Sequence, residues 1–140
     1  MRGRWIGKLE GALLPAARRE EGRGDGGRDE GAYHPRIMTE SEFHAAVEAV
    51  LARIEAAVEP IDALDADLEG GVLTITCADE SRIIVNRQTP NREIWVAARS
   101  GGFHFAFRDG AWRDTRSADE LFAALARLIE AQSGENVAFE

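Results

Sequence analysis

Hydrophobic residues recur at helical spacing over residues 43–58. The residues before them, Thr39-x-x-Glu42, have the form of a capping box, and Pro60 favours an end near Val58. The apolar positions are Phe43, Val47, Val50, Leu51, Ile54 and Val58. They predict an amphipathic helix at the start of the folded part of the chain.

A second helical pattern lies near the C-terminus. Ser117-x-x-Glu120 is predicted to cap it, and Gly134 is predicted to end it. Its apolar side consists of Leu121, Phe122, Leu125, Leu128 and Ile129. Beyond this helix, Val137 and Phe139 predict an extended tail that packs between the two helices.

Between the helices the hydrophobic pattern changes to a period of two, which is typical of strands. Turn sequences separate the apolar runs, which lie at 72–77, 83–85, 94–98, 103–107 and around 112. An acidic first strand before Gly70 completes a set of about six. Asn86, Arg87 and Gln88 are predicted in a polar turn that Pro90 closes.

This order of elements predicts an α+β fold, a two-layer α-β sandwich. The N- and C-terminal helices pack on one face of an antiparallel sheet, and the other face meets water. We expect Trp95 to be exposed on that other face, near Asn86, Arg87 and Gln88. Since Trp and Arg are enriched at binding hot spots, the four residues predict a protein-docking surface.

Charge and glycine divide the chain of 140 residues into two parts. Residues 1–37 are Gly-rich with a net charge of +2, and are predicted to be a disordered or non-native N-terminal extension. Residues 38–140 carry a net charge of −10 and form the single expected domain. No apolar run approaches the ~18 residues of a membrane span, and an acidic domain repels phosphate backbones. We therefore expect neither a membrane nor nucleic acid as partner.

The acidity is concentrated in residues 40–69, which hold nine carboxylates and a single basic residue, Arg53. Glu48, Glu55 and Glu59 fall on one helical stripe, and the acidity continues beyond the helix. A solvated helix face is the alternative interpretation, because surface helices are usually charged. Clustered carboxylates without basic partners offer oxygen ligands to hard cations such as Fe3+ and, less selectively, to Fe2+, Ca2+ or Mn2+. Such binding should be weak, multi-site and salt-sensitive.

The histidines and the single cysteine predict no catalytic site. His44, His104 and Cys77 have spacings that match neither a triad nor a closed metal site, so we expect no enzyme. His44 either joins the acidic stripe or is an ordinary histidine. Cys77 alternates with Leu73 and Ile75, which predicts a small buried hydrophobe.

Asn86-Arg87-Gln88-x-Pro90, with Trp95 beyond it, is the most distinctive motif in the chain. It is accompanied, in order between Met38 and Phe139, by the segments 41–44 (Ser-Glu-Phe-His), 70–76 (Gly-Gly-Val-Leu-Thr-Ile-Thr), 101–105 (Gly-Gly-Phe-His-Phe) and Trp112. Together these residues resemble the frataxin family, in particular the bacterial CyaY-type frataxins. The resemblance implies the same α-β sandwich.

The resemblance also implies an iron-binding protein of iron–sulfur cluster assembly. Such a protein docks on the cysteine desulfurase and scaffold complex as iron donor or as regulator. By position, the implied iron ligands are Glu40, Glu42, Glu48, Glu55, Glu59, Asp62, Asp65 and Asp67. The implied partner-binding residues are Asn86, Arg87, Gln88 and Trp95. Ala56 and Pro60 stand where relatives are often acidic, which predicts weaker iron binding.

Two alternatives remain open. The acidic residues could form an interaction module that regulates the desulfurase without iron. A ferroxidase or iron-storage protein is the third interpretation, although the Glu/His sets of a buried di-iron site are missing. We expect a monomer, with oligomers only on iron loading, in the cytoplasm of a bacterium.

Overall fold

The computed structural model describes residues 38–139, and the predicted N-terminal extension, residues 1–37, lies outside them. Helix α2 (Glu40–Val58) comes first and helix α3 (Leu121–Ser133) last. The strands between them are β1 (Asp65–Glu69), β2 (Val72–Thr76), β3 (Arg82–Gln88), β4 (Glu93–Ala98), β5 (Gly101–Arg108) and β6 (Ala111–Asp114).

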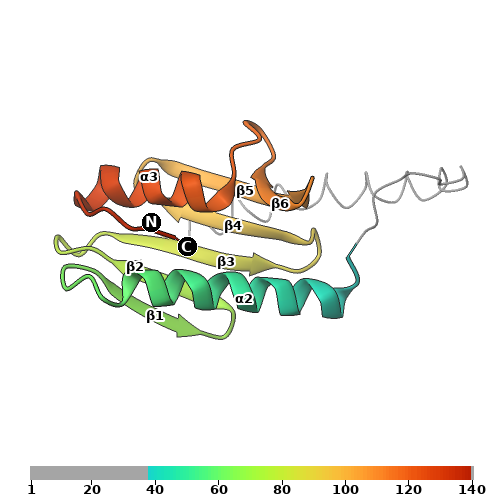
Figure 1. Ribbon diagram of the computed structural model, residues 1–140, viewed down its shortest axis with the longest axis horizontal. Helices are drawn as coiled ribbons and strands as arrows, with labels where there is room; N and C mark the ends of the chain where they lie inside the picture. Colours follow the sequence, from blue (N-terminus) through green and yellow to red (C-terminus); the bar gives the residue numbers. More distant parts are fainter. Residues whose placement is uncertain (1–37, 140) are drawn as a thin grey trace, which may run out of the picture.

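The six strands form one antiparallel sheet, and their order in the sheet is their order in the sequence. Both helices lie on the same face of this sheet (Figure 1). The predicted two-layer α-β sandwich is therefore confirmed. Neither described helix is long and apolar enough to cross a membrane.

The hydrophobic core fills the layer between the helices and the sheet. Alternate strand residues point into it, namely Leu73, Ile75, Ile83, Val85, Ile94, Val96, Phe105 and Trp112. Helix α2 contributes all six of its predicted apolar residues, and Cys77 is buried as predicted. Each large apolar side chain fully removed from water contributes about 1.5–3 kcal/mol, so this layer holds the helices in place.

The two helix starts differ in how they are capped. At α2 the predicted capping box is present: the Glu42 N–H donates to Thr39 Oγ1, and the Thr39 N–H donates to a Glu42 carboxylate oxygen. At α3 the prediction of Ser117 as the cap is wrong, because Glu120 accepts the Ala123 N–H at 3.0 Å. Glu120 forms a β-bridge with Arg113, which keeps its backbone extended and delays the helix.

Strand β3 is longer than predicted and runs to Gln88. The predicted polar turn at Asn86, Arg87 and Gln88 is therefore wrong. Pairing with β4 satisfies the backbone groups of these residues, and polar side chains do not prevent it. The turn is made by residues 89–92, where the Arg92 N–H donates to the Thr89 carbonyl oxygen at 3.0 Å.

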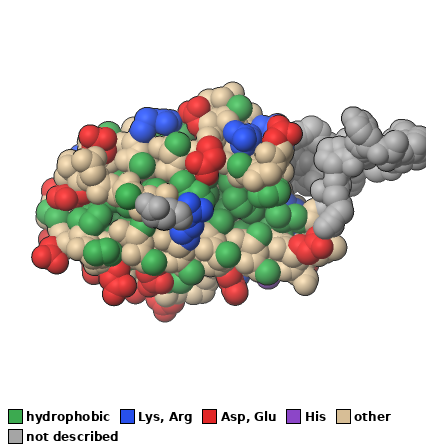
Figure 2. All heavy atoms as spheres, viewed as in Figure 1, with side chains coloured by type: hydrophobic (Ala, Val, Ile, Leu, Met, Phe, Trp, Pro, Cys, Tyr) green, Lys and Arg blue, Asp and Glu red, His purple; other side chains and the backbone are tan. Residues whose placement is uncertain are grey.

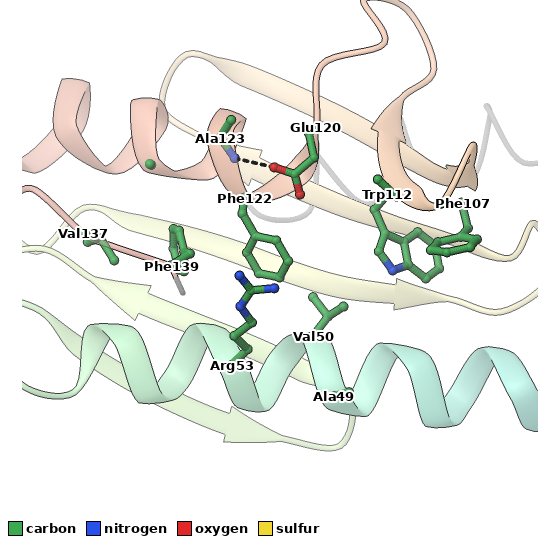
Figure 3. A pocket seen from close by; sticks show the side chains of 13 residues that line it. Ala49, Val50, Arg53, Phe107, Trp112, Glu120, Phe122, Ala123, Val137 and Phe139 are labelled. Atoms are coloured by element: carbon green, nitrogen blue, oxygen red, sulfur yellow. Dashed lines mark hydrogen bonds between the residues drawn. The ribbon is translucent and has the colours of Figure 1, made fainter.

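The C-terminal tail lies between the two helices, as predicted (Figure 1). Val137 belongs to the core and is 9% exposed. The Phe139 ring packs against Phe122, with ring centroids 5.3 Å apart. From α2, the guanidinium of Arg53 lies over the same Phe122 ring at 4.0 Å (Figure 3). The tail thus joins α3 to α2.

Truncating the buried tail residue should destabilise the protein. We expect Val137→Ala to lower the free energy of unfolding by about 1–3 kcal/mol, because it removes buried methyl groups and leaves a cavity. Urea denaturation measures this change. The neighbouring exposed residue provides the control: Asn136→Ala should stay within about 0.5 kcal/mol of the wild type. Equal effects from the two substitutions would show that the tail is not packed.

Candidate functional site

Eight carboxylates predicted as iron ligands gather on α2, the following loop and β1. We call them the acidic surface: Glu40, Glu42, Glu48, Glu55, Glu59, Asp62, Asp65 and Asp67. All are exposed except Glu55, which is half-buried. Figure 2 shows acidic side chains along this edge of the molecule.

The stripe on α2 is electrostatically unfavourable for the helix itself. Glu55 and Glu59 are separated by one helical turn, where like charges repel. Glu59 is the C-cap residue, and the last turn of α2 contains no basic residue. A negative charge there opposes the helix dipole. The helix would therefore gain stability from a different residue at this position.

The two carboxylates on β1 face away from those on α2. Ala66 and Leu68 pair with the core residues Ile75 and Leu73, so they lie on the helix side of the sheet. Asp65 and Asp67 alternate with them and point to the opposite face. The acidic surface is therefore not one flat stripe, because it wraps around the β1 edge of the sheet.

Seven of the eight carboxylates make no ion pair within residues 38–139. The eighth, Glu42, is engaged in the capping box, where its carboxylate accepts the Thr39 N–H. The only basic residue of α2, Arg53, lies over Phe122 instead. Asp79, in the turn after β2, differs from those seven carboxylates because it has hydrogen-bond partners. Hydrogen bonds from Ser81 and from the Arg99 guanidinium hold the pKa of Asp79 well below its usual range.

The acidic surface is not a formed coordination site. Among the described residues, no three His, Cys, Asp or Glu side chains converge so that they could hold one metal ion. His44 is also engaged elsewhere, because its Nε2 lies 3.3 Å from Thr89 Oγ1 in the β3–β4 turn. The geometry offers separate oxygen ligands to cations, and any ion would share them with water.

The predicted docking residues form a row across the face of the sheet away from the helices. Asn86 on β3 pairs with Trp95 on β4, which pairs with His104 on β5. Gln88 lies on the same face and pairs with Glu93. The structure thus brings Asn86, Gln88 and Trp95 together as the sequence predicted.

Trp95 is buried, although the sequence predicted that it would be exposed. It lies on the expected face and outside the core, but only 1% of its surface is accessible. The His104 ring stacks on it, with centroids 4.4 Å apart and planes 16° apart. Its Nε1–H donates to a Glu93 carboxylate oxygen at 2.7 Å. The indole is covered because it lies flat among its cross-strand neighbours, which a single strand's sequence does not reveal.

Arg87 is separated from the other three motif residues. It pairs with the core residue Ile94, so its side chain starts on the helix side of the sheet. His104 takes the place that the prediction gave to Arg87 beside Trp95. The alternation of strands β4 and β5, combined with their pairing register, is the signal that could have identified His104.

A groove of about 600 Å³ lies between α2, α3 and the β5–β6 hairpin. Figure 3 shows that its walls are mainly aromatic and aliphatic, with Phe107, Trp112 and Phe122 among them. None of the predicted site residues lines it. It adds no polar or titratable cluster to the candidate chemistry.

Comparison with known proteins gives one consistent answer. Residues 36–135 match the family model described as a frataxin-like domain. The iron-sulfur cluster assembly protein CyaY of Ralstonia nicotianae is 53% identical over 105 residues, which cover 71% of this chain and 93% of that protein. The protein of the same name from Burkholderia mallei is 48% identical over 106 residues, covering 73% and 98%.

Solved structures agree with the fold. A frataxin from Psychromonas ingrahamii superposes with a TM-score of 0.69 at 34% identity, covering 74% of this chain and 99% of that one. A trimeric frataxin from the yeast Saccharomyces cerevisiae, described as complexed with ferrous iron, gives a TM-score of 0.55 at 25% identity. It covers 72% of this chain and 91% of the yeast chain.

If α2 tolerates its acidic end at a cost in stability, reversing one charge should stabilise the protein. We expect Glu59→Lys to raise the free energy of unfolding by about 0.5–1 kcal/mol at low ionic strength, because it removes repulsion and complements the helix dipole. The gain should shrink with added salt. Glu40→Lys, at the opposite end of α2, should instead destabilise by a similar amount. Urea denaturation of both variants would contradict this account if their effects had the same sign.

Proposed function

The chain belongs to the frataxin family, and from this membership we propose that it is an iron–sulfur cluster assembly protein of the bacterial CyaY type. The acidic surface binds iron, and the sheet face around Asn86, Gln88 and Trp95 docks on the cysteine desulfurase and scaffold complex. Arg87 contributes to docking from the neighbouring side of the sheet. The protein acts in the cytoplasm, as iron donor or as regulator of the desulfurase.

The observation that carries the iron proposal is the absence of ion-pair partners on the acidic surface within residues 38–139. Seven exposed or half-exposed carboxylates keep their oxygen atoms available to cations. Oxygen ligands of this kind suit iron, in both Fe2+ and Fe3+ states. Because the carboxylates do not converge, the iron is a weakly held cargo that exchanges with solvent and with a partner.

Two other interpretations are compatible with the same surface. An iron-independent module would use the carboxylates to contact a basic surface of the desulfurase. A ferroxidase or iron-storage protein would need convergent ligands, which the described residues do not supply. We therefore propose that the protein is not an enzyme, and that it is a monomer which oligomerises, if at all, on iron loading.

Charge reversal on α2 tests iron binding. We expect Glu55→Lys/Glu59→Lys to weaken Fe2+ binding by roughly tenfold under anaerobic conditions, since two attractive charges become repulsive. Calorimetric titration measures this affinity, and wild-type binding should fall as salt increases. Because reversal at Glu59 is expected to stabilise the helix, lost binding would not reflect unfolding.

The matched control for that experiment lies on the other helix and beyond it. Glu130→Lys/Glu135→Lys changes the net charge equally but leaves the acidic surface intact. It should retain most of the iron affinity. Equal losses in the two double variants would reduce the effect to net charge and contradict a localised iron surface.

Replacement of Trp95 tests docking. We expect Trp95→Ala to weaken binding to the purified desulfurase and scaffold complex by roughly thirtyfold, because the indole, itself only 1% exposed, holds the His104 ring in place on this face. Phe107→Ala is the control, because Phe107 is an exposed aromatic residue on the helix side of the sheet. Similar losses would contradict docking through the Trp95 face. A charge-reversed variant that still docks after losing iron would favour the interaction module over iron delivery.

A further inference from the structure

The guanidinium of Arg87 lies directly against the β1–β2 turn, at Gly71. A Cβ atom at Gly71 would stand 2.9 Å from both Cζ and Nη2 of Arg87 and 3.2 Å from Nε. Non-bonded heavy atoms prefer about 3.5–4.0 Å, so a Cβ at Gly71 would push the flexible end of the Arg87 side chain away from this position. The Arg87 N–H also donates to the Gly71 carbonyl oxygen at 3.2 Å. Backbone and side chain of Arg87 thus meet the same residue.

The two glycines of this turn have different surroundings. Both have a positive φ, +60° at Gly70 and +81° at Gly71, as the tight turn requires. A Cβ at Gly70 would meet nothing within 4 Å. Gly70 is therefore explained by the turn alone, whereas Gly71 also provides space for the Arg87 side chain.

This contact decides where the Arg87 charge is presented. Ile83 and Val85, which precede Arg87 on the same side of β3, are fully buried. Arg87 is half-buried and makes no ion pair within the described part of the chain. With one part of its guanidinium against Gly71, the remaining N–H donors keep the planar fork that suits a carboxylate.

We propose that Gly71 is a positioning residue for docking. Its missing side chain seats the Arg87 guanidinium at the turn end of the sheet, where the fork binds a carboxylate of the partner protein. This contact is separate from the row of Asn86 and Trp95, which faces the other side. The inference rests on the proposed docking function, and its structural half can be tested without any partner.

A double-mutant cycle on the full chain, measured by melting temperature, tests the contact between Gly71 and the Arg87 guanidinium, which we call the seat. Gly70→Ala and Gly71→Ala both place a Cβ at a positive φ, so both should lower the melting temperature. Gly71→Ala should lower it by a further ~1–2 °C, because the flexible Arg87 side chain moves aside from the added Cβ at a small cost. Adding Arg87→Ala should recover most of that excess, whereas Gly70→Ala and Arg87→Ala should be additive. Additivity in both pairs would overturn the seat.

Affinity for the purified desulfurase and scaffold complex tests the positioning. Arg87→Ala and Gly71→Ala should each weaken binding by about tenfold. The double variant should bind no more weakly than Arg87→Ala alone, and Gly70→Ala should bind like the wild type. A merely structural role of Gly71 would still weaken binding in the absence of Arg87.

The possible failures are distinguishable. If Arg87→Ala weakens binding but Gly71→Ala behaves like Gly70→Ala, positioning is overturned while docking stands. If the wild type does not bind the complex, the proposed docking function fails and takes the positioning role with it, while the stability cycle still decides the seat. If Gly71→Ala does not fold, recovery of folding on adding Arg87→Ala supports the seat, and continued failure overturns it.

Discussion

The alternation of side chains across the antiparallel sheet is the constraint on which the rest of the structure depends. Ile83, Val85, Ile94 and Val96 are fully buried against the helices, and a slip of one residue would turn them all into solvent. The register between β3 and β4 is therefore fixed by the core. That register places Asn86 directly opposite Trp95 on the other face. The candidate docking face is thus aligned by hydrophobic residues that do not belong to it.

The same constraint separates residues that are adjacent in sequence. Asn86 and Arg87 follow one another, yet they start on opposite faces of β3, and His104 comes to lie beside Trp95 from another strand. On β1, alternation sends Asp65 and Asp67 away from the carboxylates of α2. The motif residues Asn86 and Arg87, adjacent in the chain, therefore belong to two different surfaces of the sheet. Arg87 lies at the β1–β2 turn, against Gly71.

What the sequence could predict was what depends on near neighbours in the chain. The helix α2, its capping box, the end of α3 at Gly134 and the order of the strands follow from local spacing and turn residues. The burial of Trp95, the cap at Glu120 and the seat of Arg87 depend on contacts with other strands. The alternation within one strand shows on which face of the sheet each side chain lies, but it does not show which residue of the next strand lies beside it. For this reason the sequence predicted on which strand a residue lies more reliably than which side chains it contacts.

The acidic surface shows a conflict between local stability and composition that packing does not explain. Where this protein uses a carboxylate structurally, as at Asp79, it supplies hydrogen-bond donors from Ser81 and Arg99. At the end of α2 it places Glu55 and Glu59 one turn apart, without a basic residue in the last turn. Natural sequences depart from local rules mainly where function requires it. The same repulsion that weakens the helix raises the negative potential at its surface, and that potential attracts cations or a basic partner surface from solution. A surface that remains unneutralised in the free protein is thus suited to a ligand that arrives and leaves, which is the behaviour that transient delivery or regulation requires.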